Sequence, residues 1–436
     1  MNGAEDNSGS IPLAAMRGAS VPQAFVRPNL RHAGRITVRQ AVLPLVIVAS
    51  LGLGIPALFS SRAATTDAAP ASPAATYTAD LKYLETDEVL MSRPVGIKLQ
   101  PAPFQKEPAL PGQNVVRGSL LWGPRVEQVM SFIWDKGRGR LFLDLNRNRD
   151  LTDDPKGIFD SASREGNQTF DNVHLVLPTA TGDRPARLQL QFNSYQAGNV
   201  SVYAGLCSYW QARVSLHGTD WHFGLVESLL ENKFSAAPEY LLLRPWTERQ
   251  RPFNLITSTP DFCGFTTNVF FGNRAYGLDW RCYAQGNSAK YQVTFKEQAP
   301  RLGELHVTGA GVHRLILTTG RGLTALLDRP QGTVKLPVGS YSLDEIWLRQ
   351  GETEVLRLNA GRVTVDEQRP ANLVAGGPLT NSVGVRSQGD SLLLNYRLLG
   401  VDGGAYKFPR PDYKHPPEFA VFRGTNRLAT GKFQYG

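Results

Sequence analysis

VMSFIWDKGRGRLFLDL, residues 129–145, is the stretch that decides the fold class. Short apolar runs with period-two alternation flank DKGRG, where Gly137 and Gly139 suit a tight turn, so the stretch predicts an antiparallel β-hairpin. Similar runs recur from Ala79 onward, separated by clusters of Gly, Asn, Asp and Pro. Helical periodicity is scarce, and its best example is LVESLLENKF at 225–234. The sequence therefore predicts a mainly all-β protein.

Two β-sandwich-like modules are expected after an N-terminal membrane segment. A second regular series of short β runs begins after Pro300. This spacing predicts a β-rich domain at 79–300 and an immunoglobulin-like β-sandwich at 301–436. Within the second module, LPVGSYSL predicts a turn followed by a strand with Tyr341 and Leu343 on one face.

Residues 41–60, AVLPLVIVASLGLGIPALFS, carry no charge and are long enough to span a bilayer as a helix. Arginines precede this segment, so the part of the chain after Arg62 is expected outside the cytoplasm. The segment is either a transmembrane anchor, which we favour, or a signal segment cleaved after Ala63. Residues 1–40 are expected to form a disordered cytoplasmic tail, and residues 61–78 an Ala/Pro/Thr linker.

The charge distribution argues against a nucleic-acid partner. The formal net charge is +9, but residues 1–62 hold six arginines and two acids, and the remaining charge is scattered. No basic stripe with interleaved aromatics and no recognition-helix motif occurs in the sequence. No HExxH, GxSxG, Walker or dinucleotide-binding glycine pattern occurs either. The expected partners are the membrane, through residues 41–60, and a polysaccharide or protein of the cell envelope; the oligomeric state is not predicted.

The loop that follows the hairpin has the spacing of a calcium site. Calcium takes six to eight oxygen ligands, and alternate positions of a curved loop supply them. Two positions depart from the EF-hand-like pattern: Arg149 stands where glycine is usual, and Pro155 where a bidentate glutamate is usual. Asp153 or Asp154 could supply the missing carboxylate. The predicted Ca²⁺ ligands are Asp144, Asn146, Asn148, Asp150, Thr152, Asp153 and Asp154.

Two further features bear on this loop. Arg147 and Arg149 reduce its negative charge, so binding is expected to be weak and of the extracellular type, with both arginines pointing to solvent. The alternative is a polar hairpin turn whose side chains cap its own backbone. A strand precedes the loop, whereas a helix enters a true EF-hand.

Cysteine and histidine give weaker signals. The cysteines are Cys207, Cys263 and Cys282, with no CxxC. Cys263 and Cys282 could form a disulfide in an exported protein, and the favoured alternative is three buried thiols. His217 and His222 are expected on facing strands, either as a transition-metal site or, as we favour, as ordinary cross-strand histidines.

Aromatic residues concentrate between positions 203 and 280. They could form a platform for sugar rings, but we favour a role in the core of a β-sandwich. The members of this group are Tyr203, Tyr209, Trp210, Trp221, Trp246, Phe270, Phe271, Tyr276 and Trp280.

Several stretches together resemble a group of exported proteins. LFLDLNRNRDLTDDP, LPVGSYSL, LVAGGPL, LLGVDGGAYKFP and the terminal TGKFQYG are similar to uncharacterised exported proteins of environmental bacteria. Those proteins combine a DxNxDxxxxD-type loop, an LPxGxYxL strand and a GKFxYG C-terminus. The resemblance covers residues 77–436. LPVGSYSL is also similar to the prealbumin- or immunoglobulin-like modules of secreted bacterial proteins. The resemblance implies export and β-sandwich modules, and it implies no activity.

The sequence thus predicts a membrane-anchored or secreted envelope protein of binding or structural type, with a weak calcium-binding loop. The alternative is an extracytoplasmic carbohydrate or peptide hydrolase whose site is assembled from distant residues. A concave pocket in residues 79–300 that holds two acids near the aromatic group would favour the enzyme.

Overall fold

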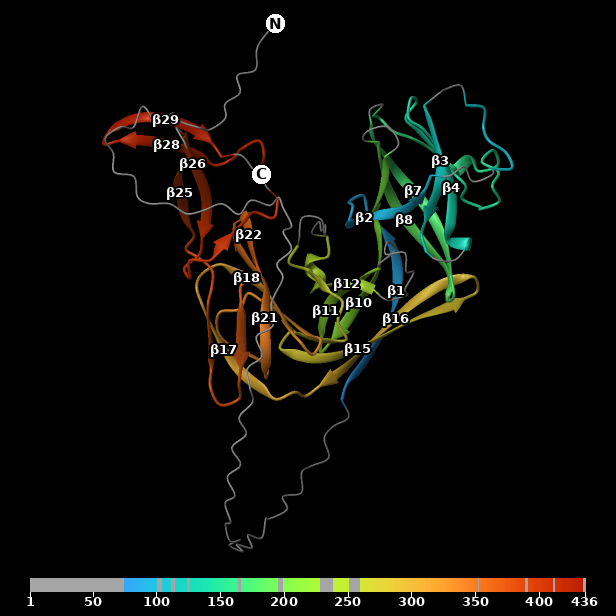
Figure 1. The fold of residues 1–436 in the computed structure, drawn as a ribbon. Helices are drawn as coiled ribbons and strands as arrows, with labels where there is room; N and C mark the ends of the chain where they lie inside the picture. The colour runs from blue at the N-terminus through green and yellow to red at the C-terminus, as the bar shows by residue number, and fades with distance from the viewer. Residues whose placement is uncertain are drawn as a thin grey trace, which may run out of the picture. The chain divides into compact units, whose positions relative to one another are not determined.

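The structure is a computed structural model (Figure 1). It describes residues 74–99, 104–110, 114–123, 126–163, 166–194, 199–227, 238–250, 259–351, 353–388, 391–410 and 412–433. The predicted tail, the membrane segment and most of the predicted linker lie outside these residues. None of the helices in the described ranges has the length and hydropathy of a membrane span.

The described chain is built from β-strands, which confirms the predicted mainly all-β class. Residues Ala74–Ser382 and Tyr396–Gly436 form one compact unit, and the hydrophobic cores and sites described below belong to it. Within the described ranges, three short 3₁₀ helices interrupt the strands: η2 (Val126–Gln128), η3 (Pro155–Gly157) and η4 (Trp246–Glu248).

The predicted hairpin at 129–145 is present. β4 and β5 pair antiparallel up to Asp135 and Arg140, and Gly139 adopts φ 62° in the turn between them. Pairing continues antiparallel from β6 through β5, β4, β3 and β2 to β9, β8 and β7. The strands are β2 (Met91–Lys98), β3 (Val115–Leu121), β4 (Val129–Asp135), β5 (Arg140–Leu143), β6 (Ile158–Asp160), β7 (Asn167–Thr179), β8 (Gly182–Ser194) and β9 (Val200–Leu206).

The first hydrophobic core lies against these strands. On β8, the alternation predicted from ARLQLQF places Leu188, Leu190 and Phe192 in the core. The Phe192 ring meets Phe132 and Trp134, each with ring centroids 5.2 Å away. Each such side chain contributes about 1.5–3 kcal/mol when fully buried. Leu141 and Leu143 of β5 belong to this core, and the loop that begins at Asp144 follows directly.

A second core lies among β1 and strands that follow β9 in the sequence. The first half of β1 pairs with β16, and its second half pairs with β10. β15 and β16 form a long hairpin (Figure 1). The strands are β1 (Thr76–Glu85), β10 (Ser208–Leu216), β11 (Thr219–Glu227), β12 (Pro238–Pro245), β13 (Phe262–Gly264), β14 (Asn268–Phe271), β15 (Arg274–Gln285) and β16 (Ser288–Gln298).

The third core lies among the C-terminal strands. As predicted, Tyr341 and Leu343 are buried on one face of β21. β14, which precedes the predicted boundary at Pro300, pairs in parallel with β19, which follows it. The strands are β17 (Leu302–Thr308), β18 (Val312–Thr319), β19 (Leu323–Asp328), β20 (Gly332–Pro337), β21 (Gly339–Gln350), β22 (Thr353–Leu358), β23 (Arg362–Val365), β24 (Ala371–Val374), β25 (Thr380–Gln388), β26 (Ser391–Leu399), β27 (Ala405–Tyr406), β28 (Glu418–Arg423) and β29 (Asn426–Lys432).

The predicted helical turn is wrong in the described part of the chain, whereas the cysteines follow the favoured alternative of free thiols. Leu225–Glu227 end strand β11 and are not helical, while residues 228–234 of the predicted helical turn lie outside the description. Cys263 and Cys282 are free thiols, as is Cys207. Cys263 lies on β13 opposite Leu241, and Cys282 on β15 opposite Tyr291, so different neighbours hold them.

Most of the aromatic group belongs to the core, as favoured. Tyr209, Trp210, Trp221, Phe270, Phe271 and Tyr276 are each less than 10% exposed. Trp246 and Trp280 are half-buried, and Tyr203 is exposed.

Candidate functional site

The loop between β5 and η3 packs on a small apolar cluster. Leu151, at its middle, is buried in a small cluster with Ile133 and Phe142 from the β4–β5 hairpin. Phe104 and Leu110 pack against the same cluster. The loop is therefore a packed feature of the fold, and its polar residues are held on either side of one buried leucine.

Alternate side chains of the loop cap its backbone. Asn146 Oδ1 accepts from the Asn148 N–H at 2.9 Å, and Asn148 Oδ1 accepts from the Asp150 N–H at 2.7 Å. Asp150 Oδ1 accepts from the Thr152 N–H at 3.0 Å. Such turns are the ordinary behaviour of Asn and Asp. This part of the self-capping alternative is confirmed, and it leaves other oxygens of the loop to be accounted for.

The two loop arginines take the backbone conformation that favours glycine. Arg147 has φ 62° and Arg149 has φ 65°. Arg149 thus provides the left-handed turn at the position where glycine is usual, at some cost in strain. Arg149 is exposed, as predicted. Arg147 does not point to solvent, which corrects the prediction: it is half-buried and donates from Nη2 to the Val176 carbonyl oxygen at 2.8 Å.

Asp144 and Asp154 are buried carboxylates with unused oxygens. They are 1% and 8% exposed. Asp144 Oδ2 accepts from the Arg149 N–H at 3.1 Å, whereas Asp144 Oδ1 and Asp154 Oδ2 have no hydrogen-bond partner within the described residues. Buried polar atoms without a partner are rare and call for an explanation.

The pKa values of the Asp144 and Asp154 carboxyls also indicate that the pair is destabilised when both groups are charged. Burial raises the pKa of the Asp144 carboxyl, although nearby backbone N–H groups and the Arg147 guanidinium partly counteract it. Burial also raises the pKa of the Asp154 carboxyl, and the negative charges of Asp144 and Asp153 raise it further. The two carboxylates therefore lie close enough to repel each other, and a cation between them would remove that repulsion.

The outer oxygens of the loop are already engaged. Asp153, which is exposed, accepts from the side-chain amides of Asn146 and Asn148 at 3.0 and 2.7 Å. Asp150 accepts from the Thr152 hydroxyl at 2.5 Å and lies 3.0 Å from Lys106 Nζ. The hydrogen bonds from Thr152 and Lys106 hold the pKa of the Asp150 carboxyl below its usual value. Of the two carboxylates left open by the sequence, Asp154 is thus the one with a free buried oxygen.

Lys106 belongs to a segment that straps the loop. The N–H of Gln105 donates to the Arg149 carbonyl oxygen at 2.8 Å, and the Leu151 N–H donates to the Lys106 carbonyl oxygen at 3.2 Å. The Lys106 ammonium places a positive charge directly on the loop. Sequence reasoning missed this residue because it lies 38 positions before Asp144, and no local pattern marks it.

The residues present fit a hard cation better than a transition metal. No three His, Cys, Asp or Glu side chains gather into a metal cluster in the described ranges. The loop instead offers carboxylate and amide oxygens, which suit calcium. The side chains that could hold it are Asp144, Asn146, Asn148 and Asp154, with the Asp150 backbone carbonyl at the position that supplies one in EF-hand loops.

The comparisons with known proteins add no relative. No family model, no curated protein and no solved structure matches this chain.

His217 and His222 do not come together. His217 lies with Gly218 in the turn between β10 and β11, and its Nε2 is 3.1 Å from Glu297 Oε2. His222 is buried on β11 between Gln211 and Arg244. Burial and the Arg244 charge lower the pKa of His222 to about 4, so it is neutral at pH 7. The expectation of two histidines on facing strands is wrong, because His217 lies in the turn and the residue opposite His222 on β10 is Arg213.

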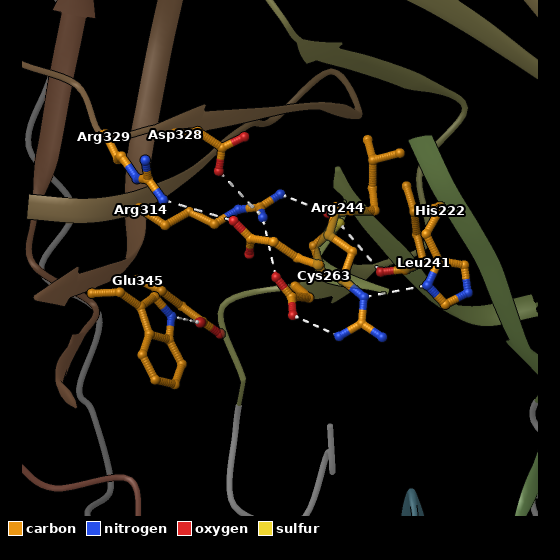
Figure 2. Close-up of polar contacts among 12 residues, drawn as sticks. His222, Leu241, Arg244, Cys263, Arg314, Asp328, Arg329 and Glu345 are labelled. Atoms are coloured by element: carbon orange, nitrogen blue, oxygen red, sulfur yellow. Dashed lines mark hydrogen bonds and ion pairs between the residues drawn. The ribbon is translucent and has the colours of Figure 1, made fainter. Parts of the chain in front are cut away.

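His222 borders a buried ionic network (Figure 2). Asp261 is shared by two guanidinium groups: its Oδ2 is 3.4 Å from Arg244 Nη1, and its Oδ1 is 3.4 Å from Arg314 Nη1. All three residues are at most 2% exposed. Arg314 also lies 3.4 Å from Asp328. Arg244 reaches His222 on one side, and Arg314 reaches Asp328 on the other (Figure 2).

The hollow beside Tyr209 and Trp210 lacks the two acids that would favour a hydrolase. Glu227 is its one acidic residue. Glu227 accepts a hydrogen bond from Tyr291 and lies 3.3 Å from Arg184 Nη1, deep in the protein. Burial raises the pKa of the Glu227 carboxyl. This arrangement is a buried ion pair within the core.

Proposed function

We propose that this chain is an extracytoplasmic envelope protein of binding or structural type whose loop at residues 144–154 holds one Ca²⁺. The observation that carries the proposal is the pair of buried carboxylates, Asp144 and Asp154, each with an unpartnered oxygen. Two buried like charges are costly without a cation. Calcium would order the loop above the apolar contact at Leu151 and so stiffen the β4–β5–β6 sheet edge.

Weak affinity follows from the charges around the loop. Sites of this ligand charge in extracellular modules bind calcium with dissociation constants of about 0.1–1 mM. The Lys106 ammonium, 3.0 Å from Asp150 Oδ2, repels a cation and partly takes its place. Such an affinity suits a compartment rich in calcium and so agrees with export.

Removing the Lys106 charge should tighten calcium binding. We expect Lys106→Gln to lower the dissociation constant for Ca²⁺ about fivefold, because a unit charge close to the site is lost. Isothermal titration calorimetry of the full chain measures this change. The matched control is Lys335→Gln, which removes an exposed lysine on β20 far from the loop in sequence. Equal affinities in the wild type and both variants would argue that the cation does not bind at this loop.

The proposed location rests on residues 41–60, with the arginines before them on the cytoplasmic side. The proposed architecture outside is two β-sandwich-like modules, 79–300 and 301–436, the second of immunoglobulin-like type. Most residues of the third core follow position 300, which supports it, although Phe270 and Ala275 of that core precede this position. A polysaccharide or a protein of the envelope is the proposed partner.

A reporter fusion tests the location. Alkaline phosphatase fused after Tyr77 should be active, because this enzyme folds only outside the reducing cytoplasm. A fusion after Gln40 serves as the control and should be inactive. A cytoplasmic reporter that is active after Tyr77, with an inactive phosphatase there, would contradict export.

A further inference from the structure

A hollow of about 460 Å³ lies beside the hairpin of β18 and β19. This volume is typical of sites for small ligands. Half of its ten lining residues are threonines, and one is acidic. The threonines are Thr266, Thr267, Thr318, Thr319 and Thr324, and the acid is Asp344.

Three chain segments bring the threonines together. Thr318 and Thr324 are direct cross-strand partners on β18 and β19. Thr266 and Thr267 immediately precede β14, which pairs in parallel with β19. The Thr266 hydroxyl donates to the Gly322 carbonyl oxygen in the β18–β19 turn, and this bond ties the two walls together. The hollow is therefore formed by the backbone pairing of the fold.

Asp344 lies at a β-bulge beside the hollow. Leu343 on one side of this position and Ile346 on the other are both core residues, so the alternation of β21 shifts by one between them. The register with β18 shifts at the same place, which leaves Asp344 as the extra residue. Bulges re-aim side chains and are frequent beside functional sites. The Asp344 carboxylate accepts from the Thr318 hydroxyl at 2.7 Å.

One wall of the hollow is aromatic. Phe265 is half-buried and lines it, and its ring meets Trp280 edge to face, with centroids 6.2 Å apart. The hollow thus combines a carboxylate, several hydroxyls and one aromatic side chain. Its ten lining residues include no lysine, arginine or histidine.

We propose that this hollow binds a neutral sugar unit. Threonine hydroxyls donate and accept hydrogen bonds, a carboxylate accepts from two sugar hydroxyls, and the ring face covers the apolar side of a pyranose. The lone negative charge and the lack of cations disfavour uronates and phosphorylated sugars. The proposal rests on the polysaccharide partner of the proposed function, whereas the site lies on strands other than those of the calcium loop and does not depend on calcium binding.

Binding to soluble oligosaccharides tests the proposal. The full chain in detergent is titrated with cellotetraose, maltotetraose and the tetramer of N-acetylglucosamine, by calorimetry and saturation-transfer NMR. At least one should bind with a dissociation constant of about 1 mM, and trigalacturonate should bind at least about tenfold more weakly. Asp344→Asn should weaken binding about tenfold, since hydrogen bonds to a charged acceptor are lost. Phe265→Ala should weaken it similarly.

Two controls keep the outcome decisive. Asp366→Asn, at an exposed carboxylate that follows β23, should bind like the wild type. Asp154→Asn should lose calcium binding and keep sugar binding, which separates this site from the loop. If Phe265→Ala does not fold, Asp344→Asn decides alone. The proposal is overturned if none of the three neutral tetramers binds saturably at 10 mM, or if Asp344→Asn binds as tightly as the wild type.

Discussion

Asp261→Ala should lower the free energy of unfolding by about 3–5 kcal/mol. The Asp261 carboxylate lies between two guanidinium groups, and Arg244 and Arg314 are as buried as it is. Removing it takes away the carboxylate that both buried guanidinium groups contact, whereas Arg314 keeps its contact with Asp328. Differential scanning calorimetry of the full chain should show the melting temperature falling by roughly 5–10 °C.

Two variants identify the cause of this loss. Asp279→Asn removes an exposed carboxylate 3.1 Å from Lys296 Nζ and should cost less than about 1 kcal/mol. Adding Arg314→Met to Asp261→Ala should recover part of the stability, because one uncompensated charge goes with it. If the double variant were as unstable as the sum of its single changes, lost packing rather than unpaired charge would explain the effect.

Calcium should raise the melting temperature of the full chain by about 3–5 °C at 10 mM. A dissociation constant of about 0.1 mM corresponds to roughly 2.7 kcal/mol of stabilisation at this concentration. The gain comes from relieving the buried pair Asp144 and Asp154. Magnesium at the same concentration should have a smaller effect, because it demands stricter octahedral geometry. The measurement is thermal unfolding with chelator, with calcium and with magnesium.

Single substitutions decide which carboxylate completes the site. Asp144→Ala and Asp154→Asn should each abolish the calcium-dependent rise in melting temperature. Asp153→Asn should keep most of it, since the Asp153 oxygens are occupied by the amides of Asn146 and Asn148. A rise that survives Asp154→Asn and disappears in Asp153→Asn would assign the role to the exposed residue instead.

Local pattern explains what could be predicted from the sequence. The hairpin at 129–145 follows from alternation and turn glycines within seventeen residues. The spacing of Asp144, Asn146 and Asn148 likewise marks an oxygen-rich loop without any tertiary information. The strand with Tyr341 and Leu343 on one face was predictable for the same reason.

The remainder depends on tertiary packing. Asp153 and Asp154 are neighbours in sequence, and only burial separates their roles. Lys106 reaches the loop through a strap that no periodicity predicts. Asp344 shares the hollow with threonines from three other segments, and only the pairing of β14, β18 and β19 brings these segments together. The Arg244, Asp261 and Arg314 network joins parts of the chain up to 70 positions apart, so its members appear in the sequence as unrelated charges.

Equilibrium dialysis of the full chain against radioactive calcium tests the calcium site most directly. We expect one Ca²⁺ per chain with a dissociation constant of about 0.1–1 mM. The double variant Asp144→Ala/Asp154→Asn should bind none, with calorimetry showing that it is folded. Absence of bound calcium in the wild type at 10 mM, or an unchanged stoichiometry in the double variant, would contradict the calcium site at residues 144–154.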